Sequence, residues 1–163
     1  FKTNWHFIMN DKRSLQDIHA PKSICFGCGP LNENGLKIKS YKYKNGLRMS
    51  FHPKREHQAF PGVLNGGIIG TLFDCHGNWT AAMSIFESNN QKQFPATVTA
   101  FFEVQLLKPT PVDTKIEIFS KIITSSKNKA KVELELFSKN DICAKSIGVF
   151  VSVKEGHPAF YRW

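Results

Sequence analysis

The chain has 163 residues, of which 41% are hydrophobic and 21% are charged. A chain of this length fits one domain with a continuous core, and no stretch is long and apolar enough to predict a membrane span. The net charge of +9 comes largely from lysines that alternate with apolar residues, as they do on solvated strand faces. Because no basic helical stripe or nucleic-acid motif accompanies them, we expect no nucleic-acid partner.

The N-terminal region, residues 1–23, mixes aromatic and charged residues without a clear period. We expect an arm there, with one short helix from Ser14 to His19. The sequence begins at Phe1 rather than Met, so we expect either that its true start lies upstream or that a targeting peptide is missing. Four cysteines in a chain with a full core and no secretory segment favour reduced thiols. We therefore expect an intracellular protein, in the cytoplasm or in an organelle.

Cys25 and Cys28 have the C-x-x-C spacing of a zinc half-site or a redox pair. A structural zinc site built on this spacing needs a second pair, and Cys75 and Cys143 stand far apart in the sequence. We therefore expect no metal site and no cofactor. Residues 24–34 are interpreted as a loop that contains two small apolar thiols.

Alternating apolar residues predict a hairpin with strands at 36–43 and 47–52, around the turn signal Asn45-Gly46. Apolar residues at helical spacing then predict one helix at about 66–86. Further alternation predicts four strands, at 98–106, 116–122, 132–136 and 147–153. This order of elements predicts an α+β fold, in which a mostly antiparallel curved sheet of about six strands wraps around one long central helix.

One face of the predicted helix carries almost no side chains except for a carboxylate. At helical spacing this face presents Gly67, Gly70, Asp74, Gly77 and Ala81. Each glycine costs about 1 kcal/mol relative to alanine inside a helix, so the pattern indicates that another backbone or a ligand approaches closely. We expect Asp74 to project into a tight, sheltered space, where a carboxylate needs a partner or a catalytic task.

The helix begins at Asn65-Gly66-Gly67, where an asparagine cap and free backbone N–H groups suit a developing oxyanion. Gly66 and Asp74 lie eight residues apart in one helix, which separates them by roughly 12 Å. They cannot act on one carbonyl group within one chain. If both are catalytic, the site combines two chains, and we expect a homodimer or homotetramer as the active species.

Three segments, CFGCGPLNENGLKIKSY, HQAFPGVLNGGIIGTLFDCHGNWTA and TVTAFFEVQLLKPTPVDTKI, resemble the hotdog-fold acyl-CoA thioesterases of the 4-hydroxybenzoyl-CoA and phenylacetate-pathway type. The resemblance covers about residues 24–153. It implies a hotdog domain at 24–154 and a C-terminal tail at 155–163. It also implies that Asp74 is the nucleophile or general base, that the N–H of Gly66 polarises the thioester carbonyl, and that Thr99 helps to hold the attacking water or carboxylate.

Asn65 departs from the family pattern, which has a histidine at this position. An asparagine can cap the helix and donate a hydrogen bond, but it cannot take up a proton at neutral pH. We keep Asn65 among the candidate catalytic residues on this basis. His57, Gln58 and Gly67 are candidates for lining the substrate pocket.

The favoured interpretation is a metal-independent thioesterase that hydrolyses a fatty or aromatic acyl-CoA. The alternative is a non-catalytic acyl-CoA-binding or lipid-binding protein of the same fold, which the replacement of histidine by Asn65 favours. A hotdog hydratase is a third possibility, but it would need a histidine working with Asp74.

Overall fold

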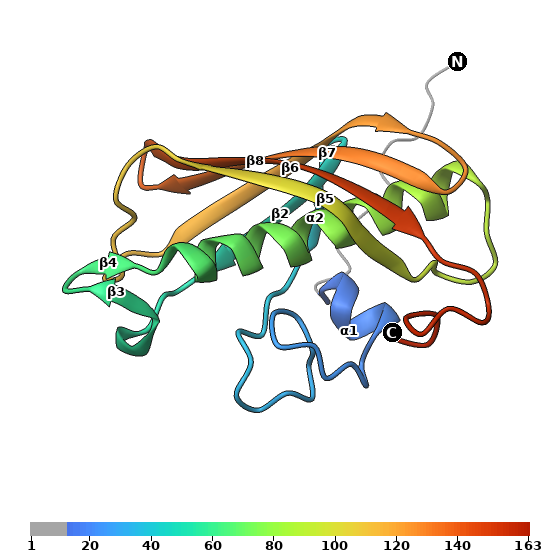
Figure 1. The fold of residues 1–163 in the computed structure, drawn as a ribbon, viewed down its shortest axis with the longest axis horizontal. Coiled ribbons are helices and arrows are strands. Elements are labelled where there is room, and N and C mark those ends of the chain that lie inside the picture. The colour runs from blue at the N-terminus through green and yellow to red at the C-terminus, as the bar shows by residue number, and fades with distance from the viewer. Residues whose placement is uncertain (1–12) are drawn as a thin grey trace, which may run out of the picture.

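The computed structural model describes residues 13–163 (Figure 1). Six antiparallel strands form one sheet in the order β1-β2-β6-β7-β8-β5, and helix α2 (Gly66–Ser88) runs along one face of the arched sheet. The strands are β1 (Tyr41–Tyr43), β2 (Gly46–Phe51), β5 (Thr97–Leu106), β6 (Ile116–Ser125), β7 (Lys129–Ser138) and β8 (Asp141–Ser152). The predicted α+β architecture, with about six strands around one long helix, is confirmed.

Helix α2 is buried on most of its circumference, because the sheet covers one side and the loop of residues 20–40 covers another. Leu72, Phe73 and Trp79 are all at most 1% exposed. The helix begins after Asn65, whose side chain accepts hydrogen bonds from the N–H groups of Gly67 and Ile68. Its apolar content therefore reflects burial on two sides rather than a single apolar stripe.

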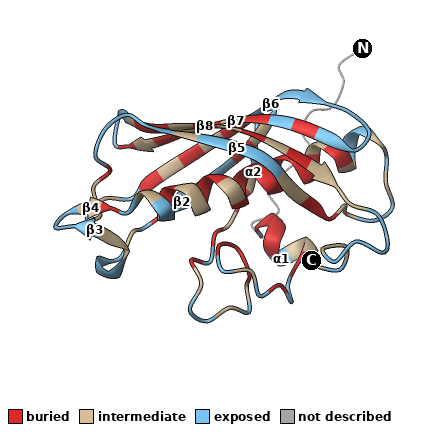
Figure 2. Cartoon of the chain, viewed as in Figure 1, coloured by how far each residue is buried: buried red, intermediate tan, exposed pale blue. Residues whose placement is uncertain are grey.

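The sheet alternates between a packed inner face and a charged outer face (Figure 2). The inner positions are fully buried at Ile116, Ile118, Val132, Leu134, Leu136 and Phe150. On the outer face, ion pairs join Lys121 to Glu133 at 2.5 Å and Lys145 to Glu135 at 2.9 Å across neighbouring strands. These lysines occupy strand faces, as their alternation with apolar residues predicts.

The first predicted strand is shorter than expected. Only residues 41–43 join the sheet as β1, because residues 36–40 bond to the preceding loop instead. The N–H of Leu36 donates to the carbonyl of Phe26 at 2.8 Å, and that of Ile38 donates to the carbonyl of Gly27 at 3.0 Å.

Three short elements between β2 and α2 were not predicted. A 3₁₀ turn at Arg55–His57 is followed by β3 (Gln58–Phe60) and β4 (Val63–Leu64), which form a two-stranded sheet beside the start of α2. The turn between these strands places Gly62 at φ 82°, a conformation that favours glycine. Runs of two or three residues carry too little periodicity to be recognised from the sequence.

Both ends of the described chain pack against this body. The predicted short helix is confirmed as α1 (Leu15–His19), and the Gln16 amide donates to the Ser40 hydroxyl at 3.0 Å. At the other end, the Trp163 ring lies 4.3 Å from that of Trp79. Residues 1–12 of the predicted arm lie outside the described residues, and the division at 23 and 154 stays a prediction. Within residues 13–163, no helix has both the length and the hydropathy that a membrane span requires.

Candidate active site

Asp74 ends a chain of hydrogen bonds that crosses from α2 to β5. The hydroxyl of Thr99 donates to Oδ1 of Asp74 at 2.5 Å, and the amide of Asn78 donates to the hydroxyl of Thr99 at 2.9 Å. Asn78 is buried and lies one turn after Asp74, whereas Asp74 is half-buried. The helix and the strand thus hold one carboxylate oxygen in place.

Strand β5 is anchored to α2 at the point where it presents Thr99. The hydroxyl of Thr97 donates to the backbone carbonyl of Asn78 at 3.3 Å. The pairing of β5 with β8 shifts register between Thr99 and Phe101, which makes Ala100 an extra residue at that point. Bulges of this kind redirect neighbouring side chains and are common beside functional sites.

Asp74 is held without a cation. Among the ion pairs of residues 13–163, none joins Asp74 to a lysine or an arginine. A structural aspartate in a helix usually has such a partner or a set of backbone donors. A half-exposed carboxylate that receives one hydroxyl donor keeps lone pairs for attack on a substrate or for proton transfer.

The expected tight space around the glycine stripe is found at only one of its ends. A Cβ atom on Gly77 would lie 2.5 Å from the Phe150 ring, so close packing there excludes a larger residue. A Cβ atom on Gly70 would come no closer than 4.0 Å to Phe102, and Gly67 is exposed. A Cβ atom on Gly67 would lie 3.0 Å from Oδ1 of Asn65, the helix's own cap. Asp74 itself is half-buried within one chain, with room beside it at Gly70, so its full sheltering stays a prediction.

At the start of α2, the cap determines which N–H groups are free. Oδ1 of Asn65 accepts from the N–H of Gly67 at 2.7 Å and from that of Ile68 at 3.4 Å. Gly66 is the first helical residue, so its N–H has no partner within the helix. Of the two glycines, Gly66 is thus the better candidate for donating a hydrogen bond to a ligand.

His57 and Gln58 make their hydrogen bonds within the loop that precedes α2. Nδ1 of His57 accepts from the N–H of Lys54 at 3.0 Å, and partial burial lowers the pKa of the imidazole. The carbonyl of Gln58's side chain accepts from the N–H of Gly62 at 2.6 Å. The backbone carbonyl of His57 also accepts from the N–H of Asn65 at 2.9 Å. These residues brace the start of α2, and their contact with substrate stays a prediction.

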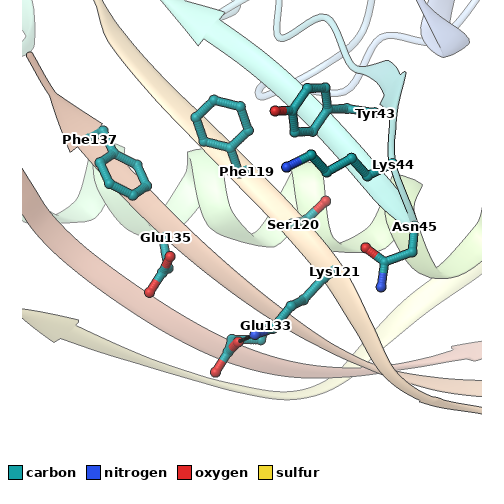
Figure 3. A pocket seen from close by; sticks show the side chains of 9 residues that line it. All are labelled: Tyr43, Lys44, Asn45, Phe119, Ser120, Lys121, Glu133, Glu135 and Phe137. Carbon is teal, nitrogen blue, oxygen red and sulfur yellow. Dashed lines mark ion pairs between the residues drawn. The ribbon is translucent and has the colours of Figure 1, made fainter. Parts of the chain in front are cut away.

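Two cavities lie away from Asp74. One, of about 280 Å³, opens on the outer face of the sheet between the rings of Tyr43, Phe119 and Phe137 and the Lys121–Glu133 ion pair (Figure 3). The other, of about 570 Å³, lies between the β1–β2 hairpin and the last turns of α2. Neither contains Asp74 or the start of α2, so neither can serve the predicted site.

The sequence reasoning missed Asn78. Its position four residues after Asp74 places both side chains on the same side of α2, and this spacing was the available signal. That Thr99 would be the third member followed from the family resemblance rather than from spacing.

No family model matches the chain, and no curated protein matches it by sequence. Among solved structures, a thioesterase superfamily protein from Shewanella loihica is 32% identical to it, with a TM-score of 0.61, over 72% of this chain and 91% of the other. The PaaI protein of the Escherichia coli phenylacetic acid degradation operon is 12% identical, with a TM-score of 0.62, over 73% of this chain and 81% of its own.

A hypothetical thioesterase from Streptococcus pneumoniae, solved with coenzyme A, is 14% identical, with a TM-score of 0.60, over 71% of this chain and 85% of its own. The fold is thus the hotdog fold of the thioesterases, as predicted. With the identity and coverage of the Shewanella protein, the chain belongs to the thioesterase superfamily.

Proposed function

We propose that this chain hydrolyses the thioester bond of a fatty or aromatic acyl-CoA, with Asp74 as the nucleophile or general base. The observation that carries the proposal is the half-buried Asp74 carboxylate, which Thr99 and Asn78 orient and which no cation neutralises among the described residues. Membership of the thioesterase superfamily supports the same reaction.

Two routes use the same carboxylate. In the first, an Asp74 oxygen attacks the carbonyl carbon, the C–S bond breaks, and coenzyme A leaves as a thiolate that takes up a proton. Water then hydrolyses the acyl-aspartyl anhydride. In the second, Asp74 accepts a proton from water as the water attacks, and passes it to the departing sulfur. Neither route requires a metal ion.

The carbonyl oxygen needs a donor as it becomes an oxyanion, and the N–H of Gly66 is the candidate. A single positioned donor lowers such a barrier by ~3 kcal/mol. Since Gly66 and Asp74 of one chain are roughly 12 Å apart, the donor comes from Gly66 of the partner subunit in this proposal.

The edge of the sheet supports a two-chain site. Strand β5 ends the strand order, so one of its edges pairs with no other strand among residues 13–163. Its middle is exposed in Figure 2. Large apolar side chains that are 39–59% exposed lie on it or directly after it, namely Phe101, Phe102, Leu106 and Leu107. An unpaired edge with this much apolar surface needs a cover, and a second copy of the chain supplies one beside Asp74.

The nature of the leaving group is supported by related folds. Two similar structures, from Streptococcus pneumoniae and Streptococcus mutans, hold coenzyme A and acetyl-CoA respectively. Each is 14% identical to this chain. They make a coenzyme A thioester the first substrate class to test. They do not indicate which acyl group this chain would accept.

A non-catalytic acyl-CoA-binding protein is the alternative, and Asn65 is the observation that favours it. Its side-chain oxygen accepts from the N–H groups of Gly67 and Ile68 as the helix cap, and an amide cannot take up a proton in place of the family's histidine. An Asn65→His variant distinguishes the cases. A large gain in turnover would identify the natural chain as a binder or a weakened enzyme.

The direct test is a panel of acyl-CoA esters of increasing chain length, together with aromatic acyl-CoA esters, followed by release of free thiol. We expect saturable hydrolysis of at least one ester. If calorimetry shows saturable binding of the esters and no thiol is released, the chain is an acyl-CoA-binding protein rather than a thioesterase.

A further inference from the structure

Three of the four cysteines meet where the loop of residues 20–40 packs against α2. The sulfurs of Cys25, Cys28 and Cys75 all lie within 4.8 Å of one another, and those of Cys25 and Cys75 are 3.9 Å apart. Cys28 and Cys75 are buried, whereas Cys25 is partly exposed. A loop and a helix that are about fifty residues apart in the sequence thus place three soft ligand atoms around one point.

The loop that carries the C-x-x-C pair is shaped to reach the helix. A Cβ atom on Gly27 would lie 2.3 Å from the sulfur of Cys75, and one on Gly29 would lie 2.3 Å from the backbone nitrogen of Cys25. Any larger residue at Gly27 would push the loop away from α2. The two glycines of CFGCG therefore serve to bring Cys25 and Cys28 against Cys75.

One of the sulfurs also receives a donor that suits a thiolate. The indole N–H of Trp79, one turn after Cys75, donates to the sulfur of Cys28 at 3.3 Å. Hydrogen bonds to ligand atoms from a surrounding shell orient and stabilise a metal site.

We propose that Cys25, Cys28 and Cys75 bind a zinc ion through three thiolates, with solvent in the fourth position on the partly exposed side of Cys25. Zinc–sulfur bonds of about 2.3 Å in a tetrahedron put sulfurs about 3.8 Å apart, which agrees with the 3.9 Å between Cys25 and Cys75. Binding forms three Zn–S bonds and releases the three thiol protons to solvent.

The geometry favours zinc over the other uses of three thiols. A disulfide needs about 2.05 Å between two sulfurs and leaves the third without a partner. Magnesium and calcium select oxygen ligands, so an all-sulfur set excludes them. The proposal replaces the sequence-based expectation of no metal site, which rested on the lack of a second cysteine pair and on the distance of Cys75 from Cys25 and Cys28 in the sequence.

The zinc ion would link the loop that carries Cys25 and Cys28 to α2, on a different side of the helix from the hydrogen-bonded chain of Asp74, and it takes no part in the proposed hydrolysis. The two proposals are therefore independent, and neither depends on the other.

The first experiment is elemental analysis of the protein purified with a thiol reductant and without chelators. We expect about one zinc ion per chain, and at least a ~10-fold lower content in Cys28→Ser and Cys75→Ser. The matched control is Cys143→Ser, which removes the buried thiol of β8 that lies outside the cluster. Retention of zinc in Cys75→Ser, or equal loss in Cys143→Ser, would overturn the proposal.

The second experiment keeps the natural sequence, so that a misfolded variant cannot decide the result. The reduced, metal-free protein is titrated with Co²⁺ and followed by absorbance. We expect a thiolate-to-cobalt charge-transfer band that saturates at about one equivalent and disappears when Zn²⁺ is added. If the folded, reduced protein gives no such band, the zinc site is contradicted. The same holds for protein that was purified with a disulfide among these cysteines and then reduced.

Discussion

Asp74 and Cys75 are neighbours in the sequence, yet the two sides of α2 on which they lie are built in opposite ways. The Asp74 side carries Asn78, contacts Thr99 of β5, the last strand of the sheet, and has room for a methyl group at Gly70. The Cys75 side carries Trp79 and is closed by the loop of residues 20–40.

This contrast indicates a division of labour within one helix. The closed side fixes the position of α2 through buried contacts, and the proposed zinc ion adds a further link there. The open side presents a carboxylate whose direction is already set by Thr99. A site needs both a rigid support and free space for its ligand, and the helix provides each on a different side.

The largest expected effect comes from removing the charge on the open side. In Asp74→Asn, turnover of the best acyl-CoA should fall by at least ~100-fold while binding persists, because shape is kept and the nucleophile or base is lost. Thiol release and calorimetric binding measure the two quantities. Asp141→Asn is the control, since it neutralises an exposed carboxylate that pairs with Lys108.

If Asp74 were only a structural residue, the pattern would reverse. The variant would lose melting temperature and keep its rate per folded molecule. That result would leave the open side without a catalytic group.

The next effect tests whether the edge of β5 is covered by a second chain. Phe101→Lys places a charge on a side chain that is 53% exposed in the single chain. If two copies meet there, an unpaired buried charge should weaken the dimer by roughly 3 kcal/mol, or about 100-fold in Kd. Light scattering after gel filtration gives the assembly state, and turnover should fall as the dimer dissociates.

Ile123→Lys serves as the matched variant, because Ile123 is a 43% exposed apolar residue on β6, away from the edge. It should leave the dimer unchanged. A monomeric natural chain with full activity would remove the argument for a shared site.

A smaller effect is expected from loosening Asp74 without removing it. Thr99→Val keeps the shape of the side chain but loses the donor to Asp74, and a hydrogen bond to a charged group contributes about 1.5–3 kcal/mol. We expect turnover to drop by ~10-fold with little change in KM. Thr71→Val is the control, because that hydroxyl bonds to the carbonyl of Gly67 within the same helix. Equal rates in both variants would mean that Thr99 does not position the carboxylate.

Much of the fold followed from the sequence, because period and burial agree over long elements. In β6 and β7 the alternating apolar residues are the buried ones, and the helix pattern from Gly66 is long enough to exclude a strand. In β8 the alternation placed the strand but not its buried face, because Ile147, Val149 and Val151 are half-buried while Phe150 is fully buried. Residues 36–40 were misassigned because their alternation reflects contacts with the CFGCG loop rather than with a neighbouring strand.

Contacts between distant segments were harder to predict. A catalytic role for Asp74 could be proposed from its isolation in an apolar helix, whereas its partners depend on where β5 crosses that helix. Cys75 joins Cys25 and Cys28 only because the loop folds back across about fifty residues, and no spacing rule contains that information. The open state of the glycine stripe likewise depends on how far β5 lies from α2, which the pattern of glycines does not specify.

The smallest effects come from two glycines of the same stripe, and they should have opposite signs. Gly70→Ala adds a methyl group with 4.0 Å to its nearest neighbour, so the gain in helix propensity should stabilise the protein by about 0.5–1 kcal/mol. Gly77→Ala puts a methyl group 2.5 Å from the Phe150 ring, and the crowding of about 1–3 kcal/mol should outweigh that gain. Urea unfolding measures both changes. Destabilisation by Gly70→Ala would mean that a second chain already lies against this part of the helix in the assembled protein, so that the open side is closed by assembly rather than by substrate.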